Sequence, residues 1–116
     1  MTVRRLKTYA SSQGFVYQYY FAGQRKMAGL DAVEYVFEVT LDGVRSFPVG
    51  VVLPQSAAAA WAEAHQRELS ESERYAAAKL SLFRAFDDIQ NLETGATRLH
   101  IDAGFLEESL ASLGVD

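Results

Sequence analysis

Residues 33–53 read VEYVFEVTLDGVRSFPVGVVL, and this stretch decides the fold of the chain. Apolar and polar residues alternate from Val33 to Val39, which is the two-residue period of a strand with one buried face. A second apolar set, from Phe47 to Leu53, follows the dipeptide Asp42-Gly43. The two sets predict a β-hairpin, because a turn between them can bring both apolar faces to the same side.

The same requirement predicts the turn. A two-residue Asp42-Gly43 turn would place the apolar sets on opposite faces, whereas a three-residue loop, Leu41-Asp42-Gly43, keeps them together. We expect a type I turn that ends in a left-handed glycine. The predicted register is given by the pairs Phe37–Phe47, Tyr35–Val49, Val33–Val51 and Val36–Pro48.

Two further strands are predicted before the hairpin. Residues 4–10 have the composition of a charged edge strand, and Ser11–Gly14 has that of a turn. Phe15–Phe21 is rich in aromatic residues, which favour strands. The connection from there to the hairpin, Ala22–Ala32, contains glycines and cations, and we expect it to be an exposed loop.

After the hairpin the hydrophobic period changes from two to about 3.6, which predicts helices. Ser56–Arg67 is dominated by alanine and predicts a helix anchored by Trp61, and the preceding Pro54 is suited to a first helical position. A second helix begins at the capping box Ser70-Glu-Ser-Glu73 and runs to about Leu92. The predicted i,i+4 ion pairs on these helices are Glu63–Arg67 and Arg84–Asp88.

The last part of the chain predicts a short strand over Thr97–Ile101 and a final helix capped by Asp102. We expect this helix to pack on the body through Phe105, Leu106, Leu110 and Leu113. The element order is (β)βββαα(β)α. It predicts the α+β class, with an antiparallel sheet of three to five strands and two main helices packed on one face, in a single domain spanning residues 1–116.

Composition excludes several kinds of chemistry. The chain has no cysteine and only two histidines, so thiol catalysis, disulfides and a multi-histidine metal site are excluded. His65 and His100 have no evident partner, and adjacent acids such as Asp87-Asp88 usually solvate a helix surface. We therefore predict no catalytic, metal or cofactor-binding residue, and we lean against an enzyme.

Charge and hydropathy limit the kinds of partner that the chain is expected to have. Residues 1–53 carry six Lys or Arg against four Asp or Glu, a balance of +2, and residues 54–116 carry five against eleven, a balance of −6. This acidic total argues against nucleic acid, which attracts strongly positive surfaces. No run approaches membrane-spanning length, so we expect no membrane partner and a cytoplasmic location. Arginine outnumbers lysine eight to three, which hints at a prokaryotic source.

The outer sheet face, away from the predicted core, is too apolar for a hydrated surface and too polar for a core. Glu34 and Glu38 share this face and could present paired exposed carboxylates, although their ordinary role is to keep a sheet face soluble. Such a mixed patch is typical of an interface, unless the N-terminal segment or the final helix covers it. The candidate interaction residues are Val16, Gln18, Tyr20, Glu34, Val36, Glu38 and Pro48.

Two functional hypotheses follow. The first is a non-enzymatic interaction or accessory module that acts as a homodimer, or binds another protein, through the outer face and the Ala22–Ala32 loop. The alternative is a domain or minor enzyme that binds a small molecule in a cavity between sheet and helices, because buried tyrosine hydroxyls need partners. The residues predicted to line that cavity are Tyr17, Tyr19, Tyr35, Trp61 and Tyr75.

Overall fold

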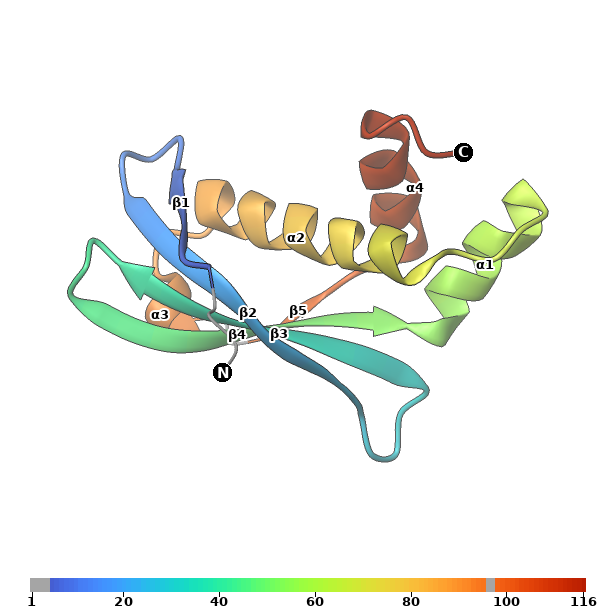
Figure 1. Ribbon diagram of the computed structural model, residues 1–116, viewed down its shortest axis with the longest axis horizontal. Coiled ribbons are helices and arrows are strands. Elements are labelled where there is room, and N and C mark those ends of the chain that lie inside the picture. The colour runs from blue at the N-terminus through green and yellow to red at the C-terminus, as the bar shows by residue number, and fades with distance from the viewer. Residues whose placement is uncertain (1–4, 96–97) are drawn as a thin grey trace.

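The computed structural model describes residues 5–95 and 98–116, and it shows a five-stranded sheet with the main helices on one face (Figure 1). The strands are β1 (Lys7–Ala10), β2 (Val16–Lys26), β3 (Ala32–Leu41), β4 (Arg45–Pro54) and β5 (Arg98–His100). The helices are α1 (Gln55–His65), α2 (Glu71–Asp88), α3 (Leu92–Gly95) and α4 (Ala103–Ser112). The α+β class is confirmed, and the element order matches the prediction apart from the additional short helix α3.

The strands lie in chain order, β1-β2-β3-β4-β5, and the pairs from β1 to β4 are antiparallel as predicted. The pair β4–β5 is parallel, which corrects the expectation of a purely antiparallel sheet. The reason is the connection between these strands, because α1, α2 and α3 return the chain to the end of the sheet where β4 begins. No helix in the described part of the chain is long and apolar enough to span a bilayer.

The β3–β4 hairpin buries the predicted faces, but its three-residue loop lies one residue later in the chain than predicted, which changes the register. The loop is Asp42-Gly43-Val44, so Phe37 pairs with Val49. The complete inner-face set of pairs is Val39–Phe47, Phe37–Val49, Tyr35–Val51 and Val33–Leu53, and on the outer face Pro48 lies opposite Glu38.

The turn conformation explains the shift. Asp42 and Gly43 both have positive φ, 50° and 72°, whereas the predicted type I turn would leave a left-handed conformation for the glycine alone. The Val44 N–H donates to the Leu41 carbonyl oxygen at 3.0 Å, which closes the turn one residue later than predicted. Moving the loop by one residue moves each cross-strand partner by two, so the same side chains stay buried.

β2 is longer than predicted and includes the first half of the expected Ala22–Ala32 loop. The register shifts between Phe21 and Gly23, so Ala22 is the extra residue of a β-bulge. The bulge exchanges the faces of the residues beyond it. Tyr19 points toward the helices, but Arg25 lies on the outer face opposite Glu34.

Helix α2 begins as predicted and ends earlier. The Ser70 hydroxyl accepts a hydrogen bond from the Glu73 N–H, and the Glu73 carboxylate accepts one from the Ser70 N–H at 2.8 Å, which confirms the capping box. The helix stops at Asp88, and α3 then forms a separate turn instead of a continuation to Leu92. Pro54 is the N-cap of α1 and not its first helical residue.

Helix α4 packs on the body as predicted, except at its end. Asp102 is its N-cap and accepts a hydrogen bond from the Phe105 N–H at 2.7 Å. Leu106 and Leu110 are fully buried, whereas Leu113 is half exposed because the helix ends at Ser112. The helix lies on the same side of the sheet as α1 and α2, so it does not cover the outer face.

The two predicted helix ion pairs have different outcomes. Arg84 and Asp88 form their pair at 3.6 Å. Arg67 pairs instead with Glu73, at 2.9 Å, and not with Glu63. Helix α1 ends at His65, so Arg67 lies beyond it and the i,i+4 spacing no longer applies.

Candidate functional site

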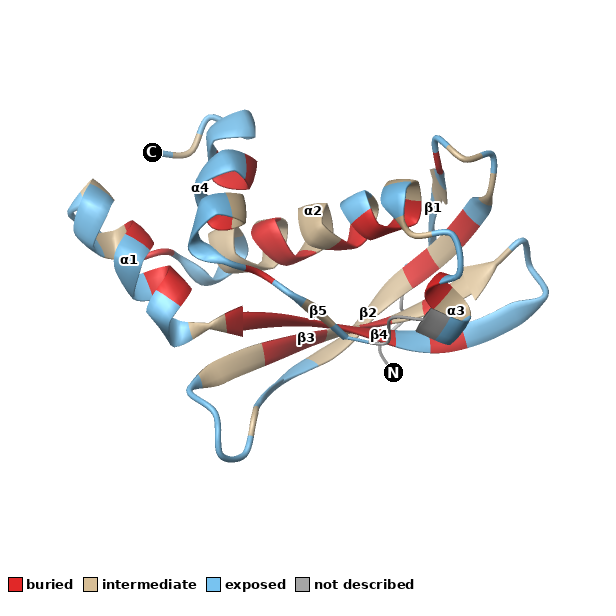
Figure 2. Ribbon diagram, turned by 180° about the vertical axis from the view of Figure 1, so that it is seen from behind, coloured by how far each residue is buried: buried red, intermediate tan, exposed pale blue. Residues whose placement is uncertain are grey.

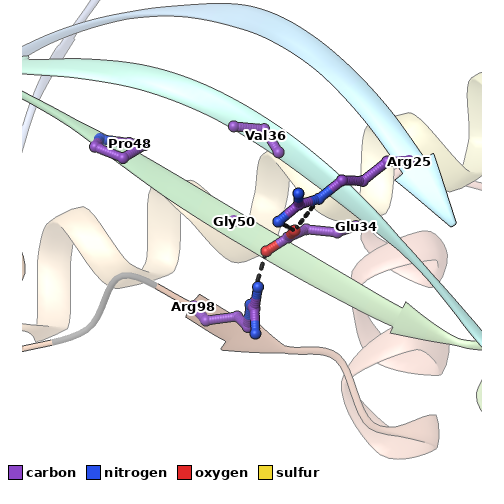
Figure 3. A pocket seen from close by; sticks show the side chains of 6 residues that line it. All are labelled: Arg25, Glu34, Val36, Pro48, Gly50 and Arg98. Atoms are coloured by element: carbon purple, nitrogen blue, oxygen red, sulfur yellow. Dashed lines mark hydrogen bonds and ion pairs between the residues drawn. The ribbon is translucent and has the colours of Figure 1, made fainter. Parts of the chain in front are cut away.

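A buried carboxylate held between two arginines stands on the outer face of the sheet (Figure 3). Glu34 of β3 is 3 % exposed. Its Oε1 accepts hydrogen bonds from Arg25 Nε at 2.8 Å and Nη2 at 2.7 Å, and its Oε2 accepts one from Arg98 Nε at 2.8 Å. Both oxygens of the carboxylate are therefore bound, and the three side chains come from three different strands.

Backbone features place these three groups together. The β-bulge in β2 turns Arg25 to the outer face, and the parallel strand β5 puts Arg98 beside Gly50 of β4. Gly50 leaves the space in which the Glu34 side chain lies across the sheet, because a Cβ added there would overlap Glu34 Oε2. A glycine is needed at this position for room and not for its backbone conformation.

The arginines keep the carboxylate ionised. Burial alone would raise the pKa of Glu34, but hydrogen bonds from Arg98 and Arg25 outweigh burial and lower the pKa below its usual value. Two guanidinium groups against one carboxylate leave an excess positive charge. The side chains of Arg25 and Arg98 are 64 % and 46 % exposed, so each presents its remaining N–H donors to solvent.

The cluster lines a shallow hollow of about 250 Å³ whose remaining walls are Val36, Pro48 and Gly50. Apolar walls beside exposed guanidinium groups fit an anionic group of a partner molecule, such as a carboxylate. Glu34 is a poor general base, because its lowered pKa and filled hydrogen bonds oppose proton uptake. The hollow is thus equipped for binding.

The predicted interaction residues all lie on the outer face, but Glu34 does not behave as expected. It was expected to be exposed and to keep the sheet face soluble, whereas it is buried between arginines. Val36 and Pro48 line the same hollow. The other members lie farther along the face, with Tyr20 opposite Glu38, Gln18 opposite Thr40 and Val16 beside the β3–β4 turn, where its N–H donates to Asp42.

Sequence reasoning missed Arg25 and Arg98. Arg25 was assigned to a loop, and Arg98 was placed on the strand 97–101 without a partner. Gly23, two residues after the strongly β-forming segment Phe15–Phe21, was a signal for a bulge, and Gly50 within the second hairpin strand was a signal for a side chain crossing the sheet.

The tyrosines predicted to line a cavity are spread along the inner face. Tyr17 stacks on Phe86 of α2, with ring centroids 4.2 Å apart. The Tyr35 hydroxyl donates to Glu71 Oε1 at 3.1 Å. Trp61 stacks on His65 within α1, at 4.1 Å between ring centroids. Tyr19 and Tyr75 share a separate hollow of about 220 Å³ at the β1 edge, together with Arg5, Lys7, Tyr20 and Phe21.

The remaining titratable candidates join elements of the fold. Asp87 accepts hydrogen bonds from the Tyr9 hydroxyl at 2.7 Å and the Ser12 N–H at 2.9 Å, which lower its pKa and tie β1 to the end of α2. His65 Nε2 lies 2.8 Å from Glu107 Oε1, which links α1 to α4, and His100 is exposed on β5. Across residues 5–95 and 98–116, no three His, Cys, Asp or Glu side chains are grouped so that they could hold a metal ion.

Comparison of the chain with known protein families, with curated proteins and with solved structures gives no match. The class of protein is therefore defined by the structure alone, as an α+β domain with a five-stranded sheet, helices on one face and an arginine-held carboxylate on the other. Its function has to be inferred from the chemistry of that outer face.

Proposed function

We propose that the protein is a non-enzymatic interaction module that acts as a homodimer through the outer face of its sheet. The observation that carries the proposal is the order of charges along β3. The Arg25–Glu34–Arg98 cluster (Figure 3) supplies excess positive charge at one end. Glu38 supplies negative charge farther along β3, and Val36 lies between Glu34 and Glu38 in the strand.

This order makes the face complementary to a second copy of itself. Glu34 and Glu38 are four residues apart, which is about 13 Å along a strand, and Val36 stands midway. A two-fold axis that crosses the strands at Val36 would place Glu38 of each copy over the arginines of the other. The same patch then serves both copies, as a symmetric dimer requires.

The charges also select one orientation. A two-fold axis parallel to the strands would bring Arg25 of one copy toward Arg98 of the other, and like charges in an interface are unfavourable. In the proposed orientation the exposed guanidinium donors and the Glu38 carboxylates are paired, and the apolar Val36 side chains meet at the centre. The surface is mixed in polarity, as protein interfaces generally are.

Sedimentation velocity at micromolar concentration tests the proposal. We expect the native protein to sediment as a dimer and Val36→Glu to sediment as a monomer, because the substitution places two carboxylates against each other on the axis. Val44→Glu is the matched control. Val44 is 87 % exposed at the tip of the β3–β4 turn, away from the axis, so this variant should remain a dimer.

Glu38→Arg gives a second, independent test. It replaces the negative end of the patch with a third cation and should also produce a folded monomer, as checked by circular dichroism. A native protein that sediments as a monomer would refute the proposal. So would a dimer that survives both Val36→Glu and Glu38→Arg.

A further inference from the structure

A second hollow, at the opposite edge of the sheet, concentrates cations and aromatic rings. It has a volume of about 220 Å³ and lies where β1 and β2 meet α2. Lys79 of α2 stands beside it, with its Nζ 5.9 Å from the ring centroid of Tyr75 and 5.8 Å from that of Phe83. The lining residues are Arg5, Lys7, Tyr19, Tyr20, Phe21 and Tyr75.

The cations of this hollow form no ion pair with a carboxylate in the part of the chain that the structure describes. Arg25, Arg67, Arg84 and Arg98 all form ion pairs with Asp or Glu elsewhere on the molecule. Within residues 5–95 and 98–116, no such pair involves Arg5, Lys7 or Lys79.

The pKa of Lys79 shows the effect of placing these cations close together. The pKa of Lys79 is lowered, first because its side chain is partly buried and second because the Lys7 side chain lies beside it. Two like charges held together without a counter-charge are unfavourable. A bound anion would relieve that repulsion.

The tyrosine hydroxyls add neutral donors. Burial raises the pKa of Tyr19, and the nearby Tyr75 raises it further, while burial also raises the pKa of Tyr75. Both hydroxyls therefore stay protonated at neutral pH and can donate hydrogen bonds. The rings of Phe21 and Tyr75 meet edge to face, with centroids 5.0 Å apart, and form an apolar wall.

We propose that this hollow binds the phosphate group of a small molecule, with Lys7, Lys79 and Arg5 as the charged donors. A phosphate carries more than one negative charge and several acceptor oxygens, which suits a hollow lined by several cations and tyrosines better than a single carboxylate does. The aromatic wall gives room for the remainder of a phosphate ester. The hollow includes Tyr20 of the outer face but none of Arg25, Glu34, Val36, Glu38 or Arg98, on which the proposed dimer depends.

An NMR titration with inorganic phosphate and with phenyl phosphate, at constant ionic strength set by chloride, tests the proposal. We expect saturable shifts of the Lys7, Tyr75 and Lys79 signals with both compounds, and a rise in the measured pKa of Lys79, because the bound anion favours the charged ammonium. Tighter binding of phenyl phosphate would identify an ester as the ligand, and equal binding would identify free phosphate. Absence of saturable shifts with either compound would overturn the proposal.

Lys79→Met is the decisive variant, because it keeps the apolar stem and removes the charge. We expect it to weaken phosphate binding by about tenfold or more, as for loss of one charge-assisted contact. Lys26→Met is the matched control: it makes the same change at an exposed position near the end of β2 and should leave binding unchanged. Equal losses in the two variants would overturn the site in favour of a general charge effect.

The two proposals fail separately. Lys79→Met should sediment as the native protein does, because Lys79 does not belong to the proposed dimer face. A native protein that is monomeric but still binds phosphate would refute the dimer proposal alone. A dimer without saturable phosphate binding would refute the hollow alone.

Discussion

The two faces of the sheet are built by different physical means. On the inner face Phe37, Val39, Val49 and Val51 are completely buried beneath helices (Figure 2). On the outer face no main helix covers the sheet, yet Glu34 is almost as inaccessible, because it lies over Gly50 and is bound by two arginines. The inner face is stabilised by apolar area removed from water, and the arginine cluster by pairing and fit, so the two should respond differently to substitution and to pH.

The largest effect is expected on the inner face. Phe86 is completely buried and stacks on Tyr17, so Phe86→Ala removes a large ring and leaves a cavity. We expect the free energy of unfolding, measured by urea denaturation at fixed protein concentration, to fall by about 3–5 kcal/mol. Val44→Ala at the exposed turn is the control, and it should change stability by less than about 0.5 kcal/mol. A loss below about 1 kcal/mol for Phe86→Ala would mean that the inner face is loosely packed.

A smaller effect is expected from the residue that makes room on the outer face. Gly50→Ala adds a methyl group where the Glu34 carboxylate lies, and we expect a loss of about 1–3 kcal/mol, as for overpacking. The test is a double-mutant cycle. In a Glu34→Ala background the Gly50→Ala penalty should largely disappear, because the clash has been removed. The same penalty in both backgrounds would show that it arises from the backbone and not from the crossing side chain.

The inner face and the outer face also differ in how much of each could be predicted from the sequence. The alternation from Val33 to Val39, the aromatic strand Phe15–Phe21 and the capping box at Ser70 are local patterns, and each predicted its element correctly. The buried face of the hairpin was predicted correctly although the loop was not. The error shifted each cross-strand partner by two residues, and such a shift leaves the same side chains on the buried face. Periodicity therefore defines a face more reliably than it defines the residue pairs across it.

The arginine cluster could not be derived in the same way. It depends on one extra residue at Ala22, which turns Arg25 outward, and on a parallel pairing that brings Arg98 next to Gly50 from a distant part of the chain. Neither a bulge nor a long-range parallel pair has a local period. The outer face was recognised as unusual from its composition, but the partners of Glu34 required the assembled sheet.

The smallest expected effect is the dependence of the outer face on pH. The pKa of Glu34 is lowered in the folded protein, so its contribution to stability is complete above its unfolded value of 4.5 and is lost as the pH falls through the lower folded value. Because both arginines are about half or more exposed, solvent screening limits each pair to about 1 kcal/mol.

Glu34→Gln isolates this contribution from that of other acids, such as Glu73, whose pKa is lowered to about 2. The difference in unfolding free energy between the native protein and Glu34→Gln should be constant from pH 7 down to about pH 5 and should close at lower pH, as the native carboxylate becomes protonated. Urea denaturation across this range measures it. A difference that stays constant to acid pH would show that Glu34 stabilises the protein through its hydrogen bonds and packing and not through its charge. The outer face would then not differ from the inner face in its response to pH.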